Sequence, residues 1–330
     1  MYSGYLFVYF TGEEKLGEQV YFATSRDGLH WKDLNGGKPV LISDIGENGV
    51  RDPFILRNTL NGKYVIIATE LRIEAGKGWK AAQEKGSRSL IVWESEDLVN
   101  WSEPFSAEVG KKEAGCVWAP EAIFDEKKQA FLVFWASMVK LPGDTGAKQR
   151  IYAAYTKDFH RFSEVFLYQE GKNHIIDTTI LRLGDYYYRF SKDETEKNIR
   201  LEKSKILDQE SFTEISAPEL NALPGVEGPA AFKFNDREEW CLLVDRFAEG
   251  KGYLPLLSYD FGSGKFRIPK KSEYDLGKNT PLSEMMGLLS KYGDFLCLNF
   301  TTWADTEPEI RHIRITKSVN FLFIPFKKLF

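Results

Sequence analysis

Short apolar runs of about strand length recur along the chain, and each ends at a polar turn. The runs before five such turns read VYFATS, LIVWES, IYAAYT, IRLEKS and LPLLSY, and they are rich in β-branched and aromatic residues. Helical periodicity is nearly absent, and turn signals such as Asn61-Gly62 separate neighbouring runs. The most apolar run, at 130–139 (AFLVFWASMV), is too short to cross a bilayer. The pattern therefore predicts an all-β protein with this run as a core strand.

Each of the five turns carries an Asp that is followed a few residues later by an aromatic residue. The segments are TSRDGLHW, ESEDLVNW, YTKDFHRF, KILDQESF and SYDFGSGKF, with the Asp at positions 27, 97, 158, 208 and 260. The intervals are 70, 61, 50 and 52 residues, which is the length of a propeller blade. An Asp at a turn accepts hydrogen bonds from the backbone N–H groups after it, and an aromatic ring can cover the hairpin. We expect these five hairpins to be structural corners.

A second repeat places an acidic residue at the start of a strand, upstream of the last four hairpins. It gives Asp52 in VRDPFILR, Glu121 in APEAIFD, Asp177 in IIDTTILRL and Glu227 in VEGPAAFKF. These acids precede the hairpin Asp of their units by 45, 37, 31 and 33 residues, and we interpret them as one equivalent position in successive units. Two such repeats in a strand-rich chain predict a five-bladed β-propeller.

In a propeller the first strand of each blade runs along the central channel, so the four acids are expected to meet in one mouth. Clustered carboxylates raise the pKa of at least one member and cost stability, which makes the cluster a functional candidate. The structural alternative, that they cap strands or bind neighbouring blades, is stronger for Glu121 than for the other three. The cluster suits a divalent metal ion or a pair of carboxyls that act on a glycosidic bond. The aromatic residues Phe54, Trp118 and Trp135, expected at the same face, favour sugar chemistry.

The motifs RDPFI, WAPE, IDTT and VEGP, in this order, resemble family 43 of the glycoside hydrolases, inverting five-bladed enzymes that act on arabinosides and xylosides. The resemblance covers residues 52–266. By position it implies that Asp52 is the general base, Asp177 the modulator of the acid's pKa, and Glu227 the general acid. It also implies that Trp118 of WAPE lines the sugar pocket, with Glu121 in place of the family's Asp.

The chain departs from this family pattern in several places. Arg51 precedes the base where many members have His or Ala, and Thr178 follows Asp177 where Pro is common. The family's Arg-His-Gly segment near the C-terminus, whose His lies on the propeller axis, is replaced by GKNTPLSE before the LLSKYG run. His174 and His312 are candidate substitutes, but a lone His is more often structural. We therefore assign no metal ligand and no cofactor.

The mechanism that the resemblance implies agrees with general chemistry. Inversion needs carboxyls about 6.5–9.5 Å apart, so that a water molecule fits between the base and the anomeric carbon. Asp52 would deprotonate this water while Glu227 protonates the departing oxygen. Glu227 must hold its proton near neutral pH, and a negative Asp177 nearby would raise its pKa. We expect release of arabinose or xylose from plant-type oligosaccharides, with an α-L-arabinofuranosidase favoured over a β-xylosidase.

Two other functions are compatible with this fold. A glycoside phosphorylase would split the bond with phosphate and needs a basic pocket, which three arginines make conceivable. A non-catalytic carbohydrate-binding propeller would not need all three catalytic carboxylates, and their presence argues against it. The substrate-binding candidates of the hydrolase hypothesis are Phe54, Trp118, Glu121, Trp135, Arg189 and Arg246, and the arginines of the phosphorylase hypothesis are Arg51, Arg189 and Arg246.

Composition and charge narrow the range of partners. The 330 residues include 44 Lys and Arg against 48 Asp and Glu, and the formal net charge of −4 argues against a nucleic-acid partner. Cys116, Cys241 and Cys297 lack a CxxC pair, which suggests neither a disulfide framework nor a zinc site. The N-terminus has no basic n-region and no small-residue cleavage site. We expect a cytoplasmic protein with no membrane-spanning segment.

No linker rich in Pro, Gly or Ser divides the chain, so we expect one propeller domain over residues 1–330. Residues 1–41 supply two or three strands of a blade that lacks a first strand of its own. The strands predicted at 294–300 (DFLCLNF) and 309–316 (EIRHIRIT) would close the ring and protect its edges.

Overall fold

The computed structural model describes residues 4–277, and within them the chain forms five antiparallel sheets of consecutive strands. The first contains β1 (Tyr5–Tyr9), β2 (Tyr21–Ser25) and β3 (Trp31–Asp33), and the second contains β4 (Val50–Arg57), β5 (Tyr64–Glu70), β6 (Ser89–Ser95) and β7 (Phe105–Glu108). The third contains β8 (Trp118–Asp125), β9 (Ala130–Val139), β10 (Lys148–Thr156) and β11 (Phe166–Gln169). The fourth contains β12 (Ile175–Leu183), β13 (Tyr186–Asp193), β14 (Asn198–Ser204) and β15 (Thr213–Glu214), and the fifth contains β16 (Glu227–Lys233), β17 (Trp240–Asp245) and β18 (Tyr253–Ser258).

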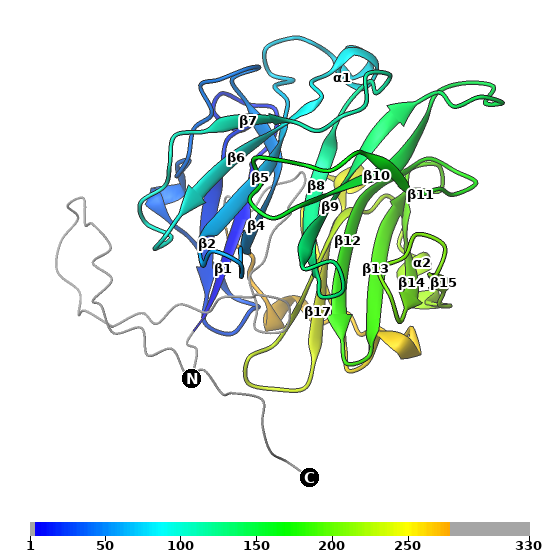
Figure 1. Ribbon diagram of the computed structural model, residues 1–330. Coiled ribbons are helices and arrows are strands. Elements are labelled where there is room, and N and C mark those ends of the chain that lie inside the picture. Colours follow the sequence, from blue (N-terminus) through cyan, green and yellow to red (C-terminus); the bar gives the residue numbers. More distant parts are fainter. Residues whose placement is uncertain (1–3, 278–330) are drawn as a thin grey trace. The chain divides into compact units, whose positions relative to one another are not determined.

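Helical segments in this part of the chain are short. They are the α-helices α1 (Trp79–Lys85) and α2 (Pro218–Asn221) and the 3₁₀ turns η1 (Asn35–Gly37), η2 (Phe247–Glu249), η3 (Phe261–Ser263) and η4 (Lys271–Glu273). None of the described helices is long and apolar enough to span a membrane. The five sheets are the blades of a β-propeller (Figure 1), and the predicted all-β, five-bladed fold is confirmed.

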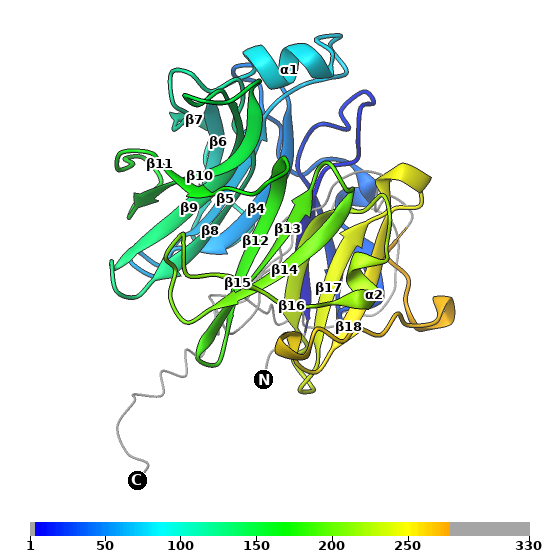
Figure 2. The ribbon, with the colours of Figure 1, turned by 90° about the vertical axis from the view of Figure 1, so that its right-hand side faces the viewer.

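The blades are held together by apolar side chains between neighbouring sheets. Strand β4 contacts β1 and β8, and β12 contacts β8 and β16, which orders the blades around one axis (Figures 1 and 2). Side chains alternate between the two faces of a strand, so each sheet contributes to the core on both sides. Trp93 packs between the first two sheets, Val133 between the second and third, and Phe134 between the third and fourth. A larger cluster that includes Phe190, Phe232 and Phe7 joins the fourth, fifth and first sheets.

The ring closes between the fifth sheet and the first. The ring of Tyr5 meets Phe232 edge-on with centroids 5.4 Å apart, and the Tyr5 hydroxyl accepts a hydrogen bond from the Asn235 N–H at 2.6 Å. At the outer edge, the Trp31 N–H donates to the Asp275 carbonyl at 2.7 Å. The hydrophobic cluster shared by the two sheets therefore continues around the ring.

The first blade lacks a first strand among residues 4–277, as the sequence predicts. Its hairpin Asp27 joins β2 to β3, whereas Asp97 joins the third and fourth strands of the second blade. Strand β1 therefore corresponds to the second strand of a complete blade. The closing strands predicted at 294–300 and 309–316 lie outside the described residues, so closure by them and a single domain over 1–330 stay predictions.

The Asp hairpins are structural corners, as predicted. The Asp97 Oδ1 atom accepts hydrogen bonds from the N–H groups of Val99 at 2.9 Å and Asn100 at 2.7 Å, and the Trp101 indole donates to the Leu98 carbonyl at 3.2 Å. Asp27 and Asp158 also accept two backbone N–H groups each, and Asp208 and Asp260 accept one each, from the residue two positions later. Burial alone would raise the pKa of Asp27, but these donated hydrogen bonds hold it at about 2.

Candidate active site

The first strands of four blades begin with the same backbone irregularity. The ladder between first and second strands shifts register between Arg51 and Phe54, Trp118 and Glu121, Ile176 and Thr178, and Glu227 and Ala230. One residue in each bulge has a positive φ: Asp52 at 48°, Ala119 at 48°, Asp177 at 45° and Gly228 at 53°. Non-glycine residues rarely adopt this conformation, which costs about 1–3 kcal/mol and persists where the surrounding structure holds it. The bulges set the direction in which the nearby acids point.

The bulges correct the prediction that the four acids share one equivalent position. Asp52 and Asp177 do, because each is the residue with positive φ. Ala119 and Gly228 take that position in the other two strands, so Glu121 lies two residues after it and Glu227 one residue before it. The variable distances to the hairpin Asp hid this offset, because loop lengths differ between blades.

Asp52 is buried near the start of β4 and is held by the adjacent strand of its own blade, which a neighbouring blade contacts in turn. The Thr69 hydroxyl donates to Asp52 Oδ2 at 2.8 Å, and the same hydroxyl oxygen accepts the N–H of Ala119 at 2.8 Å. This chain of two hydrogen bonds links the bulge of β8 to the Asp52 carboxylate through β5. The Asp52 side chain is thus positioned by two strands besides its own.

Arg51, the residue before Asp52, is buried in an ion pair. Its Nη1 lies 3.0 Å from Glu18 Oε1, and its guanidinium packs over the ring of Phe10 at 4.6 Å and over that of Trp79 at 4.8 Å. The charge of this arginine is therefore balanced by a buried carboxylate.

Asp177 lies between Glu121 and the bulge of β16. Its Oδ2 accepts the N–H of Gly228 at 3.2 Å. Burial raises the pKa of Glu121 well above its ordinary value, the negative charge of Asp177 raises it further, and a hydrogen bond with Thr179 opposes the shift. Protonation of Glu121 therefore relieves the repulsion between two buried carboxyls. The structure places Glu121 with Asp177 rather than on the surface.

Lys192 is a charged residue of this site that the sequence reasoning missed. Its ammonium is buried, contacts Glu227 Oε2, lies 2.6 Å from Glu194 Oε2 and stands 4.3 Å from the centre of the Phe247 ring. Burial disfavours the charged form, but the negative charges of Glu227, Asp177 and Glu194 outweigh it and raise the pKa of Lys192. Lys192 is therefore a permanent cation among these carboxylates.

A signal for Lys192 was present in the sequence. It pairs with Ile176 in the ladder between β12 and β13, directly beside the bulge of Asp177. The hairpin turn Leu183-Gly184-Asp185 fixes that register, so counting back from the turn places the segment SKDE next to IDTT.

The aromatic residues predicted to bind sugar lie in different places, some partly exposed near the strand starts and one in the core. Trp118 is half-buried at the start of β8 and meets the ring of Trp79 edge-on at 5.9 Å. Phe54 is half-buried and packs against the core between the second and third blades. Trp135 is a correction, because it is only 1% exposed and lies in that core, directly opposite Tyr152. Its ring has no face for a sugar.

The two arginines predicted to bind substrate also differ. Arg189 is buried between the third and fourth blades, where its Nε donates to Glu202 Oε2 at 2.8 Å and its guanidinium lies over the Phe212 ring at 4.1 Å. It pairs with Ile180, three residues along β12 from Asp177, so the prediction that it binds substrate is wrong. Arg246 follows the end of β17 and donates to the backbone carbonyls of Gly252 at 3.1 Å and Lys251 at 2.9 Å. It fixes the turn beside the start of β16.

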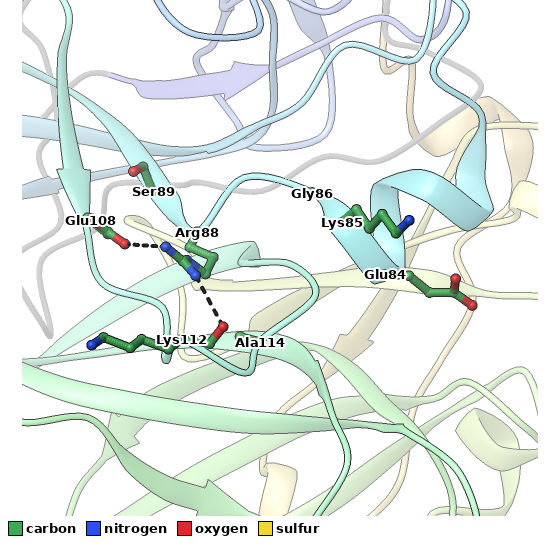
Figure 3. A pocket seen from close by; sticks show the side chains of 8 residues that line it. All are labelled: Glu84, Lys85, Gly86, Arg88, Ser89, Glu108, Lys112 and Ala114. Carbon is green, nitrogen blue, oxygen red and sulfur yellow. Dashed lines mark hydrogen bonds and ion pairs between the residues drawn. The ribbon is translucent and has the colours of Figure 1, made fainter.

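A pocket of about 510 Å³ lies elsewhere, between the C-terminal end of α1 and the outer part of the second blade (Figure 3). Arg88 crosses it to reach Glu108 at 2.8 Å and the Lys112 carbonyl at 3.1 Å. None of the four strand-start acids lines this pocket. No group of three or more His, Cys, Asp or Glu side chains within residues 4–277 is arranged to hold a metal ion, and His312 lies outside that range.

Comparison with known proteins identifies relatives of most of the chain. A family model described as "Probable glycosyl hydrolase domain", from a group related to glycoside hydrolase family 43, matches residues 1–291. An α-L-arabinofuranosidase of Bifidobacterium longum subsp. longum is 32% identical over 299 residues, which cover 74% of this chain and 27% of that protein. The chain therefore spans about a quarter of the length of this relative.

Solved structures share the fold at lower identity. A family 43 β-1,3-galactosidase with galactodeoxynojirimycin matches with a TM-score of 0.55 and 11% identity, over 81% of this chain and 90% of that one. An exo-β-1,3-galactanase from Phanerochaete chrysosporium with galactose matches with a TM-score of 0.51 and 15% identity, over 78% and 57% of the two chains. At these identities the likeness shows the five-bladed fold alone.

Proposed function

Because the chain belongs to the glycosyl hydrolase family related to family 43, we propose that it hydrolyses a glycosidic bond with inversion and releases arabinose. The family resemblance expected from the four motifs is thereby confirmed. The observation that carries the proposal is the pair of buried aspartates, Asp52 and Asp177, in the same strained bulge position of two blades. Arabinose is favoured by the name of the Bifidobacterium relative, and xylose remains the alternative sugar.

In the proposed mechanism, Asp52 accepts a proton from the attacking water. The Thr69 hydroxyl donates to Oδ2 of this carboxylate at 2.8 Å. Thr69 thereby orients the carboxylate before substrate arrives, and such pre-organisation lowers the cost of reaching the transition state. As the base, Asp52 would supply a rate factor of about 10²–10⁴.

Glu227 gives its proton to the departing oxygen, and two neighbours of opposite charge act on it. Asp177 favours the protonated form of Glu227 by like-charge repulsion, as the resemblance implies. Lys192 contacts Glu227 and favours the ionised form, so the protonation of Glu227 depends on the balance of these two charges. Lys192 is well placed to stabilise the carboxylate that Glu227 becomes once its proton has been transferred.

The geometry gives less support to the two alternatives. A phosphorylase needs cations for phosphate, but Arg51 is paired with buried Glu18, and Arg189 with Glu202. Arg246 is engaged by backbone carbonyls. A non-catalytic propeller gains nothing from strained, buried aspartates that cost stability.

A panel of nitrophenyl glycosides, assayed with and without phosphate, tests the proposal. We expect hydrolysis of the α-L-arabinofuranoside without phosphate dependence. NMR of the first product should show the anomer opposite to that of the substrate. Retained configuration, a requirement for phosphate, or no turnover of any glycoside would each contradict the proposed function.

A further inference from the structure

The connection between β5 and β6 carries the short helix α1, and its first residue is an exposed tryptophan. Trp79 is 42% exposed, in contrast to the buried acids at the strand starts. The Arg51 guanidinium lies 4.8 Å from the centre of the Trp79 ring, and the Trp118 ring meets it edge-on at 5.9 Å. Trp79 therefore contacts the first strands of two blades, β4 and β8, and Figure 1 shows α1 at one end of the sheets.

The helix that carries Trp79 is held in place by buried neighbours. Leu71, Ile73 and Ala82 form an apolar cluster beneath α1, against which Trp118 packs. The Glu18 carboxylate accepts the N–H of Ile73 at 2.8 Å and is also the partner of Arg51. The segment that presents Trp79 is thus fixed by the first blade as well as its own, and a pre-organised aromatic face binds ligand at a lower entropy cost.

Both residues that contact Trp79 are connected to the proposed base, Asp52. Arg51 directly precedes Asp52, and Trp118 directly precedes Ala119, whose N–H binds the hydroxyl that donates to Asp52. The proposed acid Glu227, with Lys192 and Phe247, comes from the fourth and fifth blades instead. In an inverting site the base acts on the face of the sugar opposite to the leaving group. A wall on the side of the base therefore touches the sugar that is released.

We propose that Trp79 joins Trp118, which the family resemblance already places in the sugar pocket, in a two-sided aromatic wall that binds the terminal sugar ring on the side of Asp52, so that single units are removed from chain ends. The inference rests on the proposed hydrolase function and deepens it. Two indoles at an interplanar angle of 82° offer a flat surface and an edge to one pentose ring.

The test compares Trp79→Ala with Trp79→Phe and with Tyr259→Ala. Tyr259 is an exposed aromatic residue in the hairpin after β18, away from the strand starts. Trp79→Ala is expected to raise, by about tenfold, both the KM for an arabino-oligosaccharide and the inhibition constant of free L-arabinose, since an aromatic contact is worth up to about 1.5 kcal/mol. Trp79→Phe should restore most of this loss, and Tyr259→Ala should change neither constant.

Three other outcomes would contradict the proposed aromatic wall. A KM that rises for the oligosaccharide while the inhibition constant of free L-arabinose stays constant would place Trp79 on the leaving-group side. No change in either constant would remove Trp79 from the site. Wild-type cleavage of a reducing-end-labelled oligosaccharide at internal bonds would contradict terminal action.

Failure of the proposed function gives a different result. If the wild-type protein hydrolyses no glycoside, the proposed hydrolase function is wrong. The aromatic wall is then tested by calorimetry, which measures the binding of L-arabinose, D-xylose and D-galactose to the wild type and to Trp79→Ala. Binding of one sugar that weakens in Trp79→Ala would support the wall without hydrolysis. Binding of none, or binding unaffected by the substitution, would overturn it.

Discussion

The outer hairpins and the inner bulges use the same residue, Asp, at turning points of the chain, but in opposite environments. At the hairpins, an Asp such as Asp97 is satisfied by N–H groups two and three residues later, and burial, which would raise its pKa, is outweighed by these bonds, which lower it. At the bulges, Asp52 and Asp177 are buried in a strained conformation and depend on residues of other strands. An acid satisfied by its own turn supports the fold, whereas acids that the fold brings together are available for chemistry.

The largest expected effect follows from removing the proposed acid or the proposed base. Asp52→Asn and Glu227→Gln should each lower kcat by about 10²–10⁴-fold, because both substitutions keep the shape and remove only the charge or the proton. Asp97→Asn is the matched control from the hairpins and should leave kcat unchanged. The measurement is turnover of an arabinoside, with circular dichroism to verify folding. Near-normal turnover in either variant would remove that residue from the mechanism.

A second effect separates the two charges beside Glu227. Asp177→Asn should move the upper limb of the pH–rate profile to lower pH, because Glu227 then loses its proton more easily. Lys192→Gln should move that limb to higher pH, because the carboxylate loses its cation. One pH unit corresponds to about 1.4 kcal/mol of interaction between charges.

The other titratable groups of this cluster are Glu121, beside Asp177, Glu194, beside Lys192, and Asp245, opposite Glu227 in the ladder between β16 and β17. They are unchanged in both variants, so the two shifts can be compared directly. Breaking a buried ion pair costs about 3–5 kcal/mol, so the profile of Lys192→Gln is measured below its melting temperature. Shifts in the same direction in both variants would contradict the opposing roles of Asp177 and Lys192.

The third prediction concerns stability at the buried acid. The pKa of Glu121 is raised in the folded protein, so its contribution to stability is present below the ordinary pKa of Glu and is lost as the pH rises toward the folded value. Glu121→Gln keeps a neutral side chain, and we expect the variant to melt at the same temperature as wild type at pH 4 and a few degrees higher at pH 8. A variant that melts lower than wild type at pH 8 would show that the Glu121 carboxylate is stabilising.

The smallest effect on stability is expected at a hairpin Asp, and its pH dependence is opposite in sign to that of Glu121. The lowered pKa of Asp97 contributes stability above the ordinary pKa of Asp, and this is lost as the pH falls through the folded value. Asp97→Ala should therefore destabilise the protein by about 1 kcal/mol at pH 7, and by less near pH 2. Thermal melts at both values check this. An equal loss at both would assign the effect to packing rather than to the ionised carboxylate.

The blade repeat was readable because it rests on local interactions. A turn Asp, the N–H groups after it and the aromatic ring on the next strand lie within a few residues of one another. The sequence near Asp27 and Trp31 is therefore enough to predict their hydrogen bonds. The thiols of Cys116 and Cys241 are buried and free, and Cys297 lies outside the described residues. The prediction that Trp135 binds sugar was wrong because the side of a strand to which a ring points depends on register.

The sequence by itself determined the all-β class and the five blades and selected Asp52, Asp177 and Glu227 as candidate acids, because repeats and motifs depend only on the order of residues. Only the tertiary structure decided the bulge offsets, the contact between Lys192 and Glu227, and the contact of Trp79 with Arg51, the residue before Asp52. A one-residue bulge turns the side chains around it without changing any spacing in the sequence. Lys192 and Glu227 lie 35 residues apart on different blades, so folding alone brings their charges together.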